Sequence, residues 1–232
     1  MTIYVKDRQI VVPGEPIGEQ GKFSIEGYVY RVNKKFYSKV LGVVYIDQDR
    51  RLVRVIPLRG KYIPVEGHKI IGKIVEVGFT NWIVDINSPY SAVLPVSEVT
   101  SKPVNISRNE LARILDEGDL ILAKVVSFDF TKDPVISIRE SKLGKIPRGS
   151  LVEISPQKIA RIIGKKGSMI SLIEEMLDVQ LIVGQNGRVV VVGSDPLKEE
   201  IAVLAIKKID AEAHISGLTD RIKEFIRERL RE

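Results

Sequence analysis

The stretch Ile159-Ala-Arg-Ile-Ile-Gly164-Lys-Lys-Gly167-Ser-Met-Ile170 decides the fold of the C-terminal part of this chain. An apolar run from Leu151 to Ile154 precedes it, and Ser155-Pro156 is a typical helix start. The pattern predicts a first helix that ends at Gly164 and a second helix that begins at Ser168, with apolar residues at helical spacing. The two glycines therefore lie in a tight turn between helices.

The composition of this turn suits a polyanionic ligand. Gly164 and Gly167 allow a sharp bend and a close approach of the backbone to a ligand. Lys165 and Lys166 are expected to point their charges into solvent, because lysine is almost never fully buried. An ordinary exposed turn without a ligand is the alternative for so short a motif.

Strands and a further helix are predicted to follow. Residues 179–183 and 189–192 form two apolar runs, separated by Gly184-Gln-Asn-Gly187, which predicts a hairpin. Asp195-Pro196 then opens a helix with one apolar face. The predicted order is strand, helix, helix, strand, strand, helix.

This order, with Ile-Gly-x-x-Gly between the first two helices, resembles a KH domain of the type with its extra strand and helix at the C-terminal end. The resemblance covers roughly residues 148–212 and implies an α+β domain whose loop clamps about four nucleotides of single-stranded nucleic acid, here RNA. With an extra C-terminal helix, this domain would span residues 148–232. Bases would lie on an apolar groove that includes Ile162, Ile163 and Ile182. The residues expected to contact RNA here are Arg161, Ile163, Gly164, Lys165, Lys166 and Gly167.

Composition limits the class of protein. The chain has 232 residues, of which 44% are hydrophobic and 28% charged, which favours a globular protein of two or three domains. No apolar run is long enough to cross a bilayer and no signal-peptide pattern occurs, so we expect a cytoplasmic protein without membrane contact. With no cysteine and only His68 and His214, no zinc site and no cofactor is predicted. Both histidines are expected at the surface.

The net charge of +6 is unevenly distributed. Residues 1–62 contain 12 Lys and Arg against 6 Asp and Glu, whereas residues 63–147 contain 10 against 11 and residues 148–232 contain 14 against 13. The excess lies in the first quarter, which indicates either a basic surface for a polyanion or acidic partner, or a solvated surface without a partner.

The N-terminal residues 1–64 predict a small all-β domain. A turn is expected at Pro13-Gly-Glu-Pro16. Strand-like runs follow at 23–32, 39–47 and 52–57, with partial alternation of apolar and polar residues.

Residues 65–141 predict five strands. A capping-box pattern at Ser107-x-x-Glu110 places a short helix between the third and fourth strands. Five strands with a helix after the third are typical of an OB-fold β-barrel. The strand-like segments are Lys69 to Val77, Trp82 to Ile86, Ala92 to Val96, Leu120 to Phe128 and Val135 to Arg139.

Three segments of this unit resemble the S1 RNA-binding family: Gly72-Lys-Ile-Val-Glu-Val-Gly78, Trp82-Ile-Val-Asp-Ile86 and Leu94-Pro-Val-Ser-Glu-Val99. The chain departs from that family where stacking aromatics and a histidine are usual, because those positions hold Thr80, Ile83 and Pro95.

These departures weaken the case for base stacking on the barrel, since a stacking platform needs an aromatic face. Phe79 and Trp82 are displaced from the usual positions, and Trp82 is equally compatible with the core, a protein contact or a base platform. Phosphate contacts on the barrel are expected from Lys73, Lys124 and Arg139.

Residues 142–150 form a short connector rich in Gly, Pro and Lys. The last segment, residues 218–230, has an apolar stripe on a highly charged helix. We expect it to pack on its own KH-like domain, with a partner or a membrane surface as alternatives.

Taken along its whole length, the chain is similar to the S1 and KH cap subunits of the archaeal exosome. Beyond the two domains, the segments that carry this resemblance are Val11-Val-Pro-Gly-Glu15, Val55-Ile-Pro-Leu-Arg-Gly-Lys-Tyr-Ile-Pro64 and Asn81-Trp-Ile-Val-Asp-Ile-Asn-Ser-Pro-Tyr90. The resemblance implies a non-catalytic RNA-binding subunit. Three such caps, alone or mixed with another cap subunit, would dock through their N-terminal domains on a hexameric phosphorolytic ring. They would pass the 3′ end of single-stranded RNA to the ring for 3′-to-5′ degradation.

Two other functions stay open. One is a stand-alone S1 and KH factor in translation or transcription. The other is a nuclease in which Asp85, Asp129 and Asp133 hold Mg²⁺, although their spacing matches no known motif. No catalytic residue or metal site is predicted.

Overall fold

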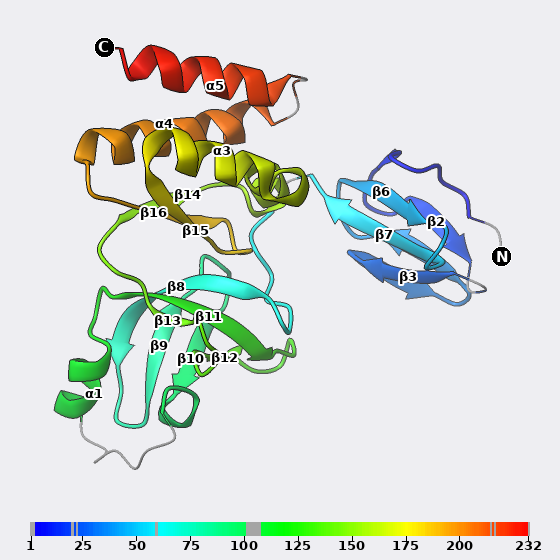
Figure 1. Cartoon of the computed structure of the whole chain (residues 1–232). Coiled ribbons are helices and arrows are strands. Elements are labelled where there is room, and N and C mark those ends of the chain that lie inside the picture. Colours follow the sequence, from blue (N-terminus) through cyan, green and yellow to red (C-terminus); the bar gives the residue numbers. More distant parts are fainter. Residues whose placement is uncertain are drawn as a thin grey trace. The chain divides into compact units, whose positions relative to one another are not determined.

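The computed structural model describes residues 3–19, 21, 23–58, 60–100, 108–213, 215 and 217–231 (Figure 1). The chain divides into two compact units, Met1–Gly60 and Lys61–Glu232. The second unit contains both the barrel and the KH domain. Each unit is described by itself.

The first unit is an all-β domain, as predicted, and it contains two sheets. One sheet has the strand order β1-β6-β7-β3 and the other the order β2-β5-β4. Buried aliphatic side chains such as Val11, Ile17 and Val53 form its core. The strands are β1 (Ile10–Val11), β2 (Pro16–Glu19), β3 (Ser24–Gly27), β4 (Val29–Val32), β5 (Lys35–Ser38), β6 (Gly42–Asp47) and β7 (Leu52–Pro57).

The run 23–32, predicted as one strand, is two strands in different sheets. β3 pairs in parallel with β7, whereas β4 pairs with β5. The chain changes sheet at Gly27, which has φ +87° and where a Cβ would lie 2.6 Å from the carbonyl oxygen of Val55. Only glycine fits this crossing. β2 and β5 were not predicted from the sequence, because β2 begins with a proline, Pro16, and β5 begins in a charged segment.

The barrel is a closed five-stranded OB fold, as predicted. β8 lies between β9 and β11, and the short β12 closes the barrel by pairing in parallel with β10 and antiparallel with β11. A two-residue strand β13 (Gly144–Lys145) extends β11. The other elements are β8 (Lys69–Val77), β9 (Asn81–Asp85), β10 (Ser91–Pro95), η1 (Val96–Glu98), α1 (Arg108–Ile114), β11 (Leu120–Ser127) and β12 (Val135–Ser137). Ser107 of the predicted capping box lies outside the described residues.

The KH domain has the predicted order of elements. Its sheet has the order β14-β16-β15, and the helices cover one face of it (Figure 1). The carboxylate of Asp195 accepts a hydrogen bond from the backbone N of Leu197 and so caps α4. The elements are β14 (Ser150–Glu153), η2 (Pro156–Lys158), α2 (Ile159–Ile163), η3 (Lys165–Gly167), α3 (Ser168–Leu177), β15 (Val179–Val183), β16 (Arg188–Gly193) and α4 (Pro196–Glu212).

The last helix, α5 (Leu218–Arg229), belongs to the KH domain. It lies along α4 (Figure 1), and its residues Ile222 and Ile226 are fully buried in the same core as α3 and α4. The expectation that this amphipathic stripe packs on its own domain is therefore confirmed. The centre of the stripe is thus covered by its own domain, whereas Leu230 at its end is 43% exposed.

Both faces of the KH sheet are buried. Along β16, Val189 and Val191 face the helices, whereas Val190 packs with Ile71 and Ile146 of the barrel. Ile182 on β15 contacts this second cluster. The prediction that Ile182 contributes to a groove for bases is therefore wrong, because its side chain faces the barrel. The continuous apolar run of β16 is typical of a strand covered on both sides.

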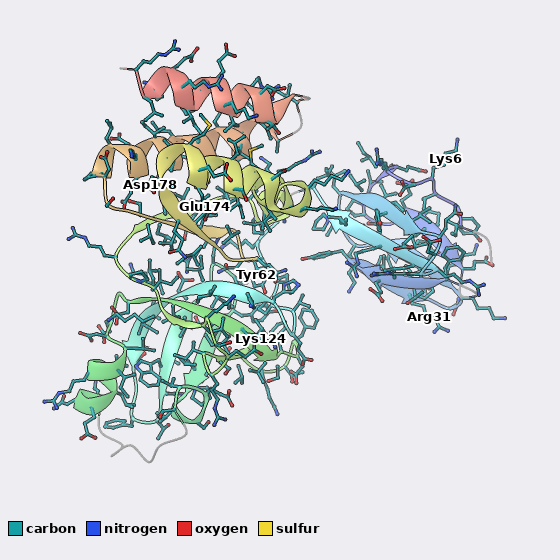
Figure 2. The ribbon with its side chains drawn as sticks, in the orientation of Figure 1. Lys6, Arg31, Tyr62, Lys124, Glu174 and Asp178 are labelled. Atoms are coloured by element: carbon teal, nitrogen blue, oxygen red, sulfur yellow. The ribbon has the colours of Figure 1, made fainter. Side chains whose placement is uncertain are left out.

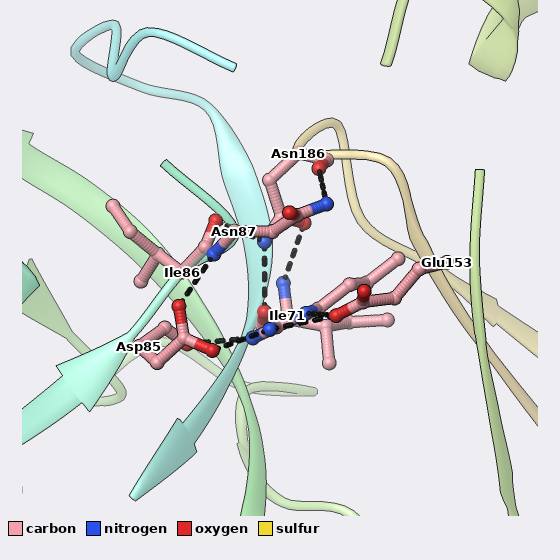
Figure 3. Close-up of polar contacts among 7 residues, drawn as sticks. Ile71, Asp85, Ile86, Asn87, Glu153 and Asn186 are labelled. Atoms are coloured by element: carbon pink, nitrogen blue, oxygen red, sulfur yellow. Dashed lines mark hydrogen bonds and ion pairs between the residues drawn. The ribbon is translucent and has the colours of Figure 1, made fainter. Parts of the chain in front are cut away.

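A group of buried polar contacts joins the KH hairpin to the barrel (Figure 3). The Asn186 amide accepts a hydrogen bond from the backbone N of Ile71 at 3.1 Å and donates to the carbonyl oxygens of Ile71 and Ile86, both at 2.8 Å. Asn186 is fully buried. Gly184 allows this contact, because a Cβ there would lie 2.7 Å from the backbone N of Ile71.

Arg188 adds a charged contact beside Asn186. Its guanidinium donates to the Asp85 carbonyl at 2.7 Å, to the Asp85 carboxylate at 2.5 Å and to Glu153 at 2.9 Å. Burial acts to raise the pKa of Asp85, but the hydrogen bonds and charge of Arg188 outweigh it and leave the pKa below its ordinary value. The barrel and the KH domain are thus held by directional contacts, which fix their mutual orientation.

Replacing Asn186 with Ala should lower the free energy of unfolding by on the order of 3 kcal/mol, because buried backbone groups of Ile71 and Ile86 lose their partners. Fluorescence of Trp82, the only tryptophan, reports the barrel during urea unfolding. The matched control is Gln185→Ala, which removes one exposed hydrogen bond to Lys69 and should cost less than about 1 kcal/mol. Equal losses in the two variants would contradict this account.

Candidate nucleic-acid interface

The predicted glycine turn lies between α2 and α3. α2 ends at Gly164, which has φ +74° and ψ 175°, a conformation open to glycine alone. Lys166 and Gly167 both have positive φ, and α3 begins at Ser168 without a side-chain cap. A Cβ on Gly164 would lie 2.7 Å from the backbone N of Met169. The loop is thus wound tightly against the start of α3.

Three cationic side chains lie in this loop or just before it. Arg161, Lys165 and Lys166 are exposed, and within the described part of the chain no side-chain hydrogen bond or ion pair is formed by any of them. The N-terminus of α3 adds the partial positive charge of a helix end. The loop is therefore suited to hold phosphate groups.

The two isoleucines before the loop differ in exposure. Ile162 is fully buried in the KH core, so its predicted contact with bases is wrong. Ile163 is 36% exposed and adjoins Gly164, where an apolar contact with a base is sterically open. The helical period explains the difference, because consecutive residues of α2 point about 100° apart.

Of the predicted phosphate contacts on the barrel, two lie together. Lys124 on β11, labelled in Figure 2, and Arg139 line one surface hollow with Glu98 and Glu140. Lys124 is paired with Glu140, whose pKa it holds below the ordinary value through a hydrogen bond. Lys73 is exposed on β8 and does not line this hollow.

Trp82 is a core residue. Its ring is fully buried, and its Nε1 donates a hydrogen bond to the carbonyl oxygen of Leu115 at 2.9 Å. This contact decides among the alternatives that the sequence left open, because a ring in this position cannot stack on a base. Phe79, by contrast, is 75% exposed.

Sequence reasoning missed a set of aromatic rings on the barrel. Tyr90, Phe128 and Phe130 contact one another edge to face, with centroid distances of 5.0 and 5.3 Å. The signal in the sequence was the alternation Phe128-x-Phe130 directly after β11. It was not sufficient, because nothing local indicates that Tyr90 joins these rings.

The carboxylates do not gather into a metal site in the part of the chain that the structure describes, where no group of three or more His, Asp or Glu side chains converges. Asp85, one of the residues considered for Mg²⁺, is committed to Arg188. His68 is half-buried and stacks on Tyr62, rather than lying free at the surface as expected, and burial lowers its pKa. His214 lies outside the described residues.

Among the described helices, none combines the length and hydropathy that a bilayer crossing requires.

Known protein families match all three parts of the chain. The family model described as the N-terminal domain of the exosome RNA-binding protein Rrp4 matches residues 8–59. The Rrp4 S1 domain model matches residues 61–127, and the KH domain model matches residues 150–208.

Whole proteins are similar over nearly the full length. The exosome complex component Rrp4 of Thermofilum pendens is 71% identical over 231 residues, covering 100% of this chain and 98% of the relative. The Methanothermus fervidus protein of the same name is 44% identical, covering 97% of each. A crystal structure described as an exosome complex RNA-binding protein aligns with a TM-score of 0.69 at 46% identity, covering 74% of this chain and 98% of that one.

The two loop glycines should respond differently to substitution. Gly164→Ala should lower the stability of the KH domain by about 3 kcal/mol, because a Cβ meets the start of α3 and the backbone conformation is strained. Gly167→Ala, where a Cβ meets open space, should cost only about 1 kcal/mol for its positive φ. Urea unfolding followed by far-ultraviolet circular dichroism measures both. A larger loss at Gly167 would disprove the loop geometry.

Proposed function

Because the chain belongs to the archaeal Rrp4 family of exosome components, we propose that it is a non-catalytic, RNA-binding cap subunit of an archaeal exosome. The observation that carries this proposal is the exposed basic loop 164–167, held between two helices of a KH domain that is itself fixed to an OB barrel. Such a loop binds RNA without cleaving it, since it contains no group that activates water or a phosphate oxygen.

In the proposed mechanism, the loop binds the sugar-phosphate backbone. Lys165, Lys166 and Arg161 neutralise phosphates, while Gly164 and Gly167 let the main chain approach the strand. Ile163 contacts a base beside the loop. Since these contacts are not specific for a base, the subunit would accept single-stranded RNA of varied sequence.

The barrel would guide the strand further. Lys73, Lys124 and Arg139 are its candidate phosphate contacts, and Lys124 must exchange its pairing with Glu140 for a phosphate. Because the barrel and the KH domain are rigidly joined, a strand that contacts both is held in one direction. Its 3′ end would then pass to a phosphorolytic ring for 3′-to-5′ degradation in the cytoplasm.

The N-terminal part, residues 1–64 in the proposed division into three domains, would dock on that ring. Its four-stranded sheet presents a row formed by Ile10, Val43 and Ile56, which are neighbours across β1, β6 and β7. Ile10 is 60% exposed and Ile56 is 43% exposed. Exposed apolar side chains on adjacent strands are typical of a protein interface.

We propose three copies of this subunit on each hexameric ring, either alone or mixed with another cap subunit.

Replacing Lys165 and Lys166 with Asp should weaken binding to a labelled single-stranded RNA and reduce the salt slope of log K by about 1.4, the value for two phosphate contacts. Both side chains are exposed, so folding should be unaffected. The charge-matched control is Lys198→Glu with Lys207→Glu on α4, which makes the same change in net charge away from the loop. If both double variants lose affinity equally, the loop is not the clamp.

Replacing Ile56 with Glu should weaken association with the ring subunits by roughly 30-fold or more, because a charge would be buried at the interface centre. Sizing chromatography of the mixed subunits measures this loss. Leu197→Glu, which changes another exposed aliphatic residue outside the N-terminal unit, should leave co-migration intact. Failure of the unmodified chain to co-migrate with any ring subunit would favour the stand-alone RNA-binding factor.

A further inference from the structure

Three aromatic rings from two separate loops meet on the barrel surface. Tyr90 lies between β9 and β10, whereas Phe128 and Phe130 lie in the loop between β11 and β12. The Tyr90 and Phe128 rings have centroids 5.0 Å apart at an interplanar angle of 64°. The Phe128 and Phe130 rings have centroids 5.3 Å apart at 63°. The array is continuous, because Phe128 touches both of the others.

The array runs from the core to the surface. Phe128 packs against the buried cluster of the barrel, and Tyr90 is partly buried. Phe130 is 75% exposed and so presents most of its ring to solvent. Phe130 contacts the partly buried ring of Phe128, which holds it in place, so the ordering cost of binding a flat ligand is small.

Hydrogen bonds from backbone N–H groups fix the main chain of the two loops that carry the rings. Thr131 donates its backbone N–H to the Asp129 carboxylate at 2.8 Å, and Tyr90 donates its backbone N–H to the Ser88 hydroxyl at 3.3 Å. The backbone N of Phe128 donates to Glu66 at 3.4 Å. The exposed phenylalanine thus extends from a closed turn.

The rings lie near the surface hollow of the barrel that contains Lys124 and Arg139. Glu66, which contacts Phe128, precedes Gly67, and Gly67 lines the hollow that contains Lys124 and Arg139. Lys132 lies in the same loop as Phe130. Aromatic rings beside cations are the combination that binds single-stranded nucleic acid, since bases stack on the rings while phosphates meet the cations.

We propose that Tyr90, Phe128 and Phe130 form a stacking platform for a base of single-stranded RNA, with Phe130 as the ring that contacts the base. This inference rests on the proposed RNA-binding function and adds to it a site for bases on the barrel. The platform would take the place of the stacking aromatics usual in S1 domains, at whose positions this chain is expected to hold Thr80 and Ile83. A stacking contact accepts any base, because every base has a π face.

The barrel provides a matched control in Phe79. Its side chain is 75% exposed, the same fraction as that of Phe130. In the described residues, however, no other ring stacks on Phe79. Removing either ring takes the same apolar surface from the barrel, and only Phe130 belongs to the array.

The test is a titration of the full chain and its variants Phe130→Ala and Phe79→Ala with a fluorescently labelled oligouridine at several salt concentrations. Phe130→Ala should lose about 5-fold to 150-fold in affinity with an unchanged salt slope, as expected for one lost base stack. Phe79→Ala should stay within about twofold of the unmodified chain. Phe130→Trp should restore binding, because the indole also stacks. An affinity of Phe130→Ala within twofold of the unmodified chain would overturn the platform, whatever the affinity of Phe79→Ala.

A second titration uses an oligonucleotide with the same backbone and no bases. The unmodified chain and Phe130→Ala should bind it equally. A loss of affinity in Phe130→Ala that persists without bases would overturn the stacking role.

If Phe130→Ala instead keeps its RNA affinity and fails to co-migrate with ring subunits, the rings contact protein and the inference is wrong. Absence of RNA binding by the unmodified chain would reject the proposed function itself. Binding that depends on Lys165 and Lys166 but not on Phe130 would reject the platform alone.

Discussion

The fully buried amide of Asn186 is the contact on which the arrangement of the RNA-binding part depends. It saturates three backbone groups of the barrel from within a hairpin of the KH domain. Since a buried polar group without a partner costs far more than a hydrogen bond contributes, alternative orientations of the two domains are disfavoured. Arg188 lies beside Asn186, and its guanidinium donates hydrogen bonds to both Asp85 and Glu153. These hydrogen bonds further restrict the orientation of the KH domain on the barrel.

This constraint affects how RNA would be held at the two proposed surfaces. A KH sheet with one free face would leave the barrel on a flexible tether, and the two binding surfaces would contact a strand independently. Here Val190 and Ile182 pack against the barrel, so the basic loop and the hollow with Lys124 and Arg139 belong to one body. A strand that contacts both surfaces loses less freedom than one bound to two tethered domains, which favours affinity without base specificity.

Charge is organised differently in the two units. In the unit that contains the barrel and the KH domain, acidic and basic side chains nearly balance, and several cations are paired, as Lys124 is with Glu140. The basic loop is therefore distinguished by its unpaired charges rather than by net charge. In the N-terminal unit, the excess of cations accompanies an exposed apolar row around Ile56, a combination suited to a folded partner with acidic groups.

In the unit that contains the barrel and the KH domain, the main elements, their order and the turn at Gly164 to Gly167 could be predicted from sequence alone. Each of these elements produces a pattern within about fifteen residues, and their order indicates the OB and KH fold classes. Only the tertiary structure decided which side chains are accessible. Ile162 and Trp82 are buried, Ile182 faces the barrel, and Tyr90 joins Phe128 and Phe130, and these outcomes depend on contacts between segments far apart in the chain. A strand pattern shows that β16 is apolar on both sides, but what covers each side is set by packing, which local sequence does not encode.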